Sequence, residues 1–272
     1  MASILLKTAL LFYAVSSICY TCWLLHASEK SENIARRTLV MGLTIHIISL
    51  LHRYIEHGYL QINNIHDILS ILSMMIVGTY CAVDKRYKVT FLGLVIAPLS
   101  FVVLLGSSAA ITLLRDYDPR LHNVWIYLHT ALAFAGYALF TISAGASGIY
   151  LFLTHKLKKK RPSSIFQKLP SLEKLDSIVF LCITIGFPML TVALVAGSFV
   201  AIGQWKDFWN LDIKQIWSVV IWLIYACILY GRHIFGWRGR RTALLSLAGI
   251  ALIAIGSVCV NVWFPGFHSF GR

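Results

Sequence analysis

The chain has 272 residues, of which 58% are hydrophobic and only 13% are charged. Soluble domains carry about 25% charged residues and cannot bury this much apolar surface, so a water-soluble globular protein is excluded. The formal net charge of +13 could attract nucleic acid, but membrane proteins become basic by gathering Lys and Arg on their cytoplasmic loops. Because no nucleic-acid-reading motif is found in the sequence, we expect the lipid bilayer, and not nucleic acid, to be the partner.

The apolar residues form runs of about 20, the length that an α-helix needs to cross a ~30 Å hydrocarbon layer. We therefore predict an all-α, polytopic helical membrane protein that forms a single integral-membrane domain over residues 1–272. The eight predicted transmembrane helices are residues 4–25, 38–55, 65–83, 89–107, 124–154, 177–203, 216–234 and 242–263. The fifth of them is long enough to project beyond the bilayer.

The Lys and Arg residues predict how these spans are oriented. Most of the 24 lie on one set of loops, above all on the Lys-rich segment 155–176, and the positive-inside rule places that set in the cytoplasm. Both termini then lie outside, and we predict a multi-pass protein of the bacterial cell (inner) membrane. The segment 155–176 is interpreted as a topology signal and solvated linker, with docking of a partner as the alternative.

Two cysteines, Cys19 and Cys22, form a C-x-x-C pair inside the first predicted span. This spacing can serve redox chemistry or metal binding. Within a membrane helix it also describes two small apolar side chains one turn apart, and we favour that interpretation. All six cysteines of the chain lie in apolar segments, so a disulfide framework is not expected.

Ten histidines are many for a membrane protein of this size. Those at or near the predicted outer boundary are His52, His57, His66, His122, His129 and His268. Histidine is a common ligand of haem iron and other transition metals, although a single interfacial histidine is more often a hydrogen-bonded anchor. His46 lies deeper, in the second span, where we expect a hydrogen bond to a neighbouring helix or, alternatively, a ligand inside the bundle.

The predicted outer loop before the seventh span is rich in aromatic residues, with Trp205, Phe208, Trp209 and Trp217 interleaved with Asp and Lys. Tryptophan prefers the membrane interface, so part of this pattern is an ordinary aromatic belt. Large rings beside cations would also suit a flat, apolar, anionic ligand, because the rings stack and the cations pair with carboxylates. Haem, a porphyrin with two propionates, is such a ligand.

In this loop the chain resembles the cytochrome c assembly protein family, the CcsA/ResC/HemX-like group, whose loop has the form W-G-x-x-W-x-W-D-P-K-E-x-W. The residues that match it are Trp205, Trp209, Asp212, Lys214 and Trp217. Residues 236–241 are similar to the family's G-W-R-G-R-R, residues 266–271 resemble G-L-H-S-Y-G, and Leu128-His129 resembles the start of its H-x(6)-S-Y region. The likeness covers residues 120–272 well and the first half loosely.

The resemblance implies a haem-handling protein of cytochrome c biogenesis, of the System II type, that binds haem b transiently at the outer face and delivers it to apocytochrome c. It implies that His129 and His268 are the axial ligands of the haem iron, and that Trp205, Trp209, Asp212, Lys214 and Trp217 bind the cofactor. The implied membrane partner is a ResB/CcsB-like subunit. The resemblance assigns no independent catalytic activity, and it leaves open a place in a haem lyase complex.

Two departures from the family pattern suggest the short HemX-like branch. Leu211 stands where the loop pattern has its third Trp, and Tyr230 replaces the family's membrane histidine. Tyrosine is a poor iron ligand without nearby cations, because its pKa is high. The alternative function is therefore a HemX-like membrane regulator of haem biosynthesis that acts through the segment 155–176 without ligating haem. A small-molecule permease is disfavoured, since we find neither an internal repeat nor mid-membrane charges.

Overall fold

The computed structural model describes residues 1–26, 28–60, 62, 64–110, 124–159, 170–205 and 213–263, except for the side chains of residues 200, 202–205, 214 and 258–263. Over these residues the chain is helical, and the structure has eight helices long and apolar enough to cross a membrane. This confirms the predicted all-α fold with eight spans. The orientation, with both termini outside, stays a prediction.

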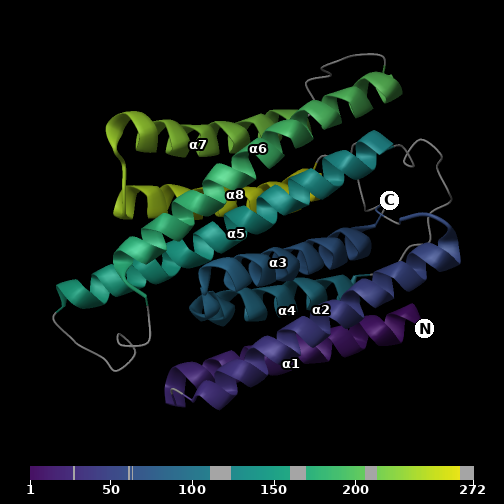
Figure 1. The fold of residues 1–272 in the computed structure, drawn as a ribbon. Helices are drawn as coiled ribbons and strands as arrows, with labels where there is room; N and C mark the ends of the chain where they lie inside the picture. The colour runs from purple at the N-terminus through teal and green to yellow at the C-terminus, as the bar shows by residue number, and fades with distance from the viewer. Residues whose placement is uncertain are drawn as a thin grey trace. The chain divides into compact units, whose positions relative to one another are not determined.

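The eight helices follow one another in the order of the predicted spans (Figure 1). They are α1 (Ala2–His26), α2 (Glu29–His57), α3 (Ile65–Tyr87), α4 (Gly93–Ala109), α5 (Val124–Lys158), α6 (Leu172–Trp205), α7 (Ile213–Phe235) and α8 (Arg240–Trp263). A short 3-10 helix, Thr90–Leu92, leads directly into α4. Helix α5 has 35 residues, or about 52 Å at 1.5 Å per residue, so it exceeds the bilayer core as predicted.

The helices fall into two compact units. The first comprises Met1–Arg115 and Pro162–Pro170, and therefore helices α1 to α4; the second comprises Asp116–Arg161 and Ser171–Arg272, and therefore helices α5 to α8. The single domain expected over residues 1–272 stays a prediction.

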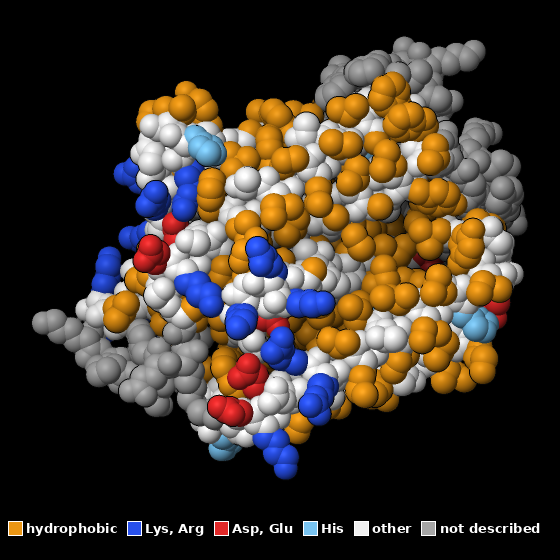
Figure 2. Space-filling model, viewed as in Figure 1, with side chains coloured by type: hydrophobic (Ala, Val, Ile, Leu, Met, Phe, Trp, Pro, Cys, Tyr) orange, Lys and Arg blue, Asp and Glu red, His pale blue; other side chains and the backbone are white. Residues whose placement is uncertain are grey.

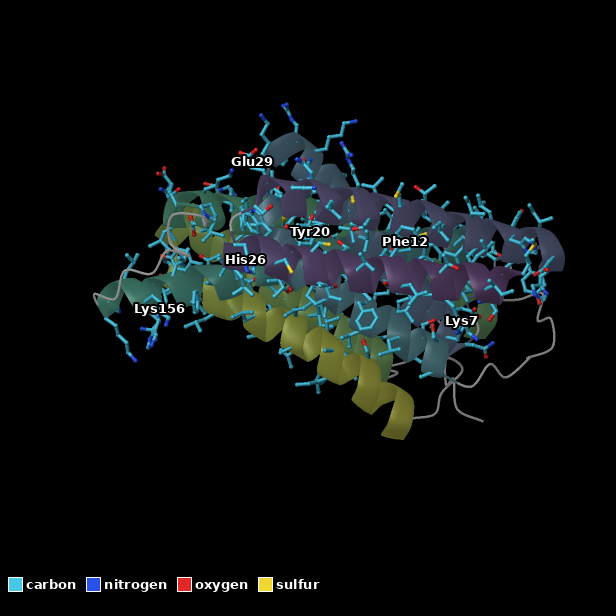
Figure 3. The ribbon with its side chains drawn as sticks, turned by 90° about the horizontal axis from the view of Figure 1, so that it is seen from below. Lys7, Phe12, Tyr20, His26, Glu29 and Lys156 are labelled. Atoms are coloured by element: carbon cyan, nitrogen blue, oxygen red, sulfur yellow. The ribbon has the colours of Figure 1, made fainter. Side chains whose placement is uncertain are left out.

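Helix α1 shows an apolar outer surface of the kind that faces lipid. On α1, the residues Ile4, Leu11, Ile18 and Leu25 are 62–70% exposed, and their seven-residue spacing puts them on one side of the helix. Figure 2 shows hydrophobic side chains along the lengths of the helices, with Lys and Arg gathered toward helix ends. In Figure 3, α1 runs from Lys7 near one end to His26 at the other.

Inside the first unit, glycines let tyrosine rings pack directly on neighbouring backbones. A Cβ at Gly42 of α2 would lie 2.8 Å from the Tyr13 ring of α1, and a Cβ at Gly93 would collide with the ring of Tyr20. Both tyrosines are fully buried. The close approach of small residues and rings therefore holds this unit together, as is common between membrane helices.

Candidate functional site

The structure describes the side chains of two of the seven predicted site residues, His129 and Trp217. The side chains of Trp205 and Lys214, and all of Trp209, Asp212 and His268, lie outside the described residues. Both described residues belong to the second unit, His129 on α5 and Trp217 on α7. Their surroundings can therefore be described within one unit.

His129 is held in one tautomer by a backbone carbonyl. It lies in the second turn of α5, and its Nδ1 is 2.7 Å from the carbonyl oxygen of Ala193 on α6. A carbonyl oxygen can only accept a hydrogen bond, so Nδ1 carries the hydrogen and the lone pair of the neutral ring lies on Nε2. Histidines that bind metals typically donate their other ring N–H in this way.

The His129 ring approaches α6 closely because residue 197 is a glycine. Gly197 follows Ala193 by one helical turn, and a Cβ at this position would lie 2.8 Å from Nδ1 and 3.0 Å from Cε1 of His129. Any larger residue would push the ring away from the carbonyl. Gly197 therefore provides the space in which the imidazole lies.

An aromatic pair lies one turn away from the histidine. Trp125 precedes His129 by four residues on α5, and its ring centroid is 4.9 Å from that of Phe199 on α6. Both side chains are partly exposed, Trp125 to 40% and Phe199 to 45%. The sequence analysis did not single out this pair, although the four-residue spacing from Trp125 to His129 was a signal that both lie on the same side of a helix.

Trp217 is also fixed by a backbone carbonyl. Its Nε1 donates a hydrogen bond of 3.1 Å to the carbonyl of Leu252 on α8, and a Cβ at Gly256 would collide with the indole. The indole is half-buried. It therefore has a set orientation against α8, which suits the platform role that the resemblance implies.

The donor set in this part of the chain fits haem. A neutral imidazole with its lone pair on Nε2 is the form of histidine that ligates haem iron, and Trp125, Phe199 and Trp217 offer aromatic surface of the kind that packs on a porphyrin. The axial ligand expected on the opposite face, His268, lies outside the described residues. The structure thus describes one half of the predicted ligand pair.

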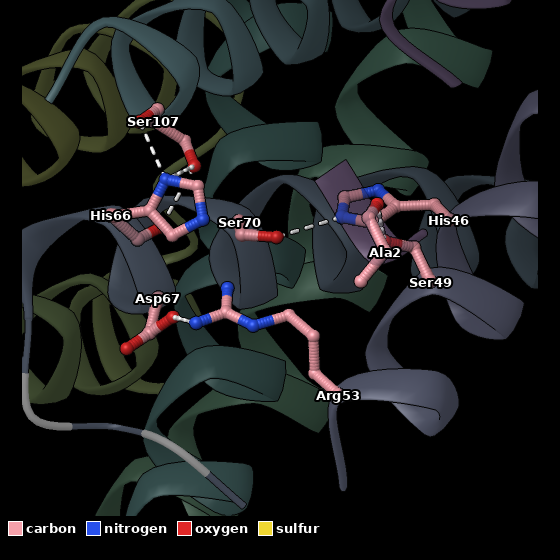
Figure 4. A network of polar contacts seen from close by, with 8 residues as sticks. All are labelled: Ala2, His46, Ser49, Arg53, His66, Asp67, Ser70 and Ser107. Carbon is pink, nitrogen blue, oxygen red and sulfur yellow. Dashed lines mark hydrogen bonds and ion pairs between the residues drawn. The ribbon is translucent and has the colours of Figure 1, made fainter. Parts of the chain in front are cut away.

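His46 of the first unit makes the contacts that the sequence analysis expected of a buried histidine. Its Nε2 is 2.9 Å from Ser70 Oγ of α3 (Figure 4), and its Nδ1 is 3.3 Å from the Tyr13 hydroxyl of α1. The side chain is fully buried. Both ring nitrogens are engaged, so a role as iron ligand would require one of these hydrogen bonds to break.

Asp67 of the first unit is both a first-turn acid and half of an ion pair. It lies in the first turn of α3, which follows Asn64 as its cap, and its Oδ1 is 2.7 Å from Nη2 of Arg53 on α2. Next to it, His66 Nδ1 lies 2.8 Å from the Ser107 carbonyl of α4 (Figure 4). These contacts join α2, α3 and α4. The sequence alone does not reveal this pair, because Arg53 and Asp67 lie on different helices.

Tyr230, at the position of the family's membrane histidine, lies near the end of α7 and is 60% exposed. Its ring makes an edge contact with Phe235. The neighbouring cation Arg232 pairs with Asp176 of α6 at 2.8 Å, and its guanidinium lies over the Phe180 ring at 4.3 Å. Arg232 therefore pairs with residues of α6, and its charge does not serve to make the Tyr230 hydroxyl a better iron ligand.

Comparison with known proteins places this geometry in context. The sequence model of the Cytochrome C assembly protein family matches residues 35–268. The chain is similar to the cytochrome c biogenesis protein CcsA of Guillardia theta, with 27% identity over 94% of this chain and 92% of that protein. It is 26% identical to the CcsA protein of Mesostigma viride over 80% of both chains. It is 24% identical to that of Synechocystis over 99% of this chain and 95% of the relative. The HemX-like branch stays a prediction.

Proposed function

Since the chain belongs to the Cytochrome C assembly protein family and is a multi-pass helical membrane protein of cytochrome c biogenesis, we propose that it binds haem b at the outer face of the membrane. The observation that carries this proposal is the 2.7 Å contact between His129 Nδ1 and the Ala193 carbonyl. It directs the imidazole lone pair to Nε2, the nitrogen that remains for an iron atom.

In this function His129 and His268 bind the iron from opposite faces of one porphyrin. Haem with two imidazole ligands is six-coordinate, which makes the pair detectable by its spectrum. Trp205, Trp209 and Trp217 cover the macrocycle in this proposal, Lys214 pairs with a propionate, and Asp212 precedes Lys214 by two residues in the same motif. The aromatic residues shield the haem from water while the two histidines hold it.

The recipient of the haem is an apocytochrome c on the outer side, presented by a ResB/CcsB-like membrane subunit. The membrane is the bacterial cell membrane, with the basic segment 155–176 on its cytoplasmic side. The chain supplies ligands and shielding to this delivery and is not itself assigned a covalent step.

The test is a visible spectrum of the full-length protein purified in detergent, together with its iron stoichiometry. The parent protein should show a six-coordinate Soret band, and His129→Ala should lose it or shift it to a five-coordinate form. Added imidazole should restore the six-coordinate band, because it can fill the vacated axial position.

His57→Ala is the matched control, since His57 ends α2 in the first unit and matches no family position. Its spectrum should equal that of the parent. A parent protein that takes up no haem when titrated with it would overturn the proposal. A parental spectrum in His129→Ala, with loss of haem in His57→Ala, would move the site to the first unit.

A further inference from the structure

Two helices of the second unit share a local motif, in which a backbone carbonyl accepts a ring N–H and a glycine follows four residues later. On α6 the carbonyl of Ala193 accepts a ring N–H from His129, and Gly197 lies four residues later. On α8 the carbonyl of Leu252 accepts a ring N–H from Trp217, and a glycine, Gly256, again lies four residues later. We call each pair a carbonyl–glycine notch.

Helix geometry explains the four-residue spacing. In an α-helix the carbonyl of residue i already accepts the N–H of residue i+4, but its oxygen has a second lone pair. The side chain of residue i+4 stands beside this lone pair and blocks it. At Gly197 an added Cβ would lie 2.8 Å from the His129 Nδ1, and at Gly256 it would collide with the Trp217 Nε1. Glycine therefore opens the second lone pair to a ring from another helix.

Aromatic rings also pack on other glycines of this unit, as Phe140 does at Gly186, but a phenyl ring has no N–H to donate to a carbonyl. At Gly148 of α5 an added Cβ would meet nothing within 4 Å. At Gly136 it would meet the backbone of α6, 3.2 Å from the carbonyl of Gly186, which is ordinary close packing of two helices. At Gly197 and Gly256 the nearest atom is the ring nitrogen of a predicted site residue.

We propose that the two carbonyl–glycine notches are positioning elements of the haem site, with Ala193 and Gly197 orienting the iron ligand and Leu252 and Gly256 orienting the aromatic platform. The inference rests on the proposed haem-binding function. Neither notch touches the haem itself. The α6 notch fixes which nitrogen of His129 is available and where it points, and the α8 notch fixes the plane of the Trp217 indole.

The decisive variant is Gly197→Ala, with Gly148→Ala as the matched control. Alanine is a better helix former than glycine, so neither change should weaken its own helix. Loss of the bond that orients a metal-binding histidine typically lowers affinity roughly 10- to 100-fold. Titration of the purified full-length protein with haem should show such a loss for Gly197→Ala, with a growing five-coordinate fraction, and parental affinity for Gly148→Ala.

A second measurement separates positioning from packing. In a His129→Ala background without added imidazole no ring occupies the notch, so adding Gly197→Ala should not change the remaining haem affinity. If Gly197→Ala alone fails to insert while the double variant folds, the ring and the added methyl are in conflict, as the inference requires. An equal loss of affinity in both backgrounds would overturn the inference, because Gly197 would then act through helix packing.

The outcomes also distinguish the inference from the function on which it rests. A parent protein without haem affinity would overturn the proposed function. A parent that binds haem through His129, together with a Gly197→Ala variant of parental affinity and spectrum, would overturn the positioning role alone.

Discussion

Two buried or half-buried histidines, one in each unit, show how the partner of a ring nitrogen decides what the ring can do. His46 is bonded at both nitrogens by hydroxyl groups, those of Tyr13 and Ser70. His129 is bonded at Nδ1 by a carbonyl. Hydroxyls can donate or accept, so they complete the bonding of His46 in either tautomer. A carbonyl only accepts, so it fixes one tautomer of His129 and assigns the lone pair to Nε2.

The contrast extends to the polar groups around the two rings. In the first unit, Arg53 and Asp67 pair with each other and His66 bonds the Ser107 carbonyl (Figure 4). The hydrogen bonds and the ion pair of these groups join neighbouring helices to one another. In the second unit, the ring of His129 is anchored through its Nδ1, and the partly exposed Trp125 and Phe199 pack against each other one turn away. The first arrangement joins helices, and the second leaves an imidazole in the tautomer that the proposed haem site requires.

The largest effect on stability is expected at the Arg53–Asp67 pair. Arg53→Met leaves the Asp67 carboxylate buried, at 2% side-chain exposure, without its cation. Removing one partner of a buried ion pair costs roughly 3–5 kcal/mol, and thermal unfolding in detergent should show it. The double variant Arg53→Met with Asp67→Leu should recover most of the loss, because no buried charge remains. Full stability of the single variant would contradict the assignment of Asp67 as a paired buried acid.

A smaller effect is expected at His46. His46→Ala removes the common partner of Tyr13 and Ser70, and a buried polar group that loses its partner costs about 1–3 kcal/mol. The unfolding temperature should therefore fall while haem content per folded protein stays at the parental value. His129→Ala should give the opposite result, with haem lost and stability little changed. Loss of the haem spectrum in His46→Ala at unchanged stability would make His46 a ligand and break the comparison.

The fold was predictable because long runs of apolar residues mark the transmembrane helices directly in the sequence. Each of the eight apolar stretches became one helix, with ends within a few residues for most of them. Two helix starts were missed by more: α2 begins at 29 instead of 38, and α6 begins at 172 instead of 177. In both cases charged residues in the first turns resemble a loop in the sequence. In the structure the Asp176 carboxylate accepts a hydrogen bond from the Gly239 N–H and pairs with Arg232, so this charged first turn is anchored to other helices.

The candidate site was predictable only in part. The resemblance pointed to His129 and Trp217, which carry recognisable side chains in recognisable motifs. The groups that orient them are backbone carbonyls. Every residue has one, so the sequence does not show which carbonyl accepts a hydrogen bond from a side chain. Nothing in the sequence sets Gly197 and Gly256 apart, because glycine is common where membrane helices pack closely. The Arg53–Asp67 pair joins different helices, so its pairing depends on packing that periodicity alone does not specify.

The smallest effect is expected at Trp217, and it tests whether the two notches serve one site. Trp217→Phe keeps most of the aromatic surface but removes the N–H that bonds the Leu252 carbonyl at 3.1 Å. The net worth of such a bond is about 0.5–1.5 kcal/mol, so the ring should stay in the protein but lose its fixed plane. We expect haem affinity to fall only a few-fold, with the six-coordinate spectrum intact because both axial histidines remain.

Trp222→Phe is the matched control, since Trp222 lies on the same helix and donates its indole N–H to Thr191 of α6 at 2.9 Å, outside the notch. A loss of six-coordination in Trp217→Phe would mean that the indole supports the iron ligand directly. An equal, few-fold loss in both variants would mean that α7 tryptophans act through packing of the bundle and not through the platform.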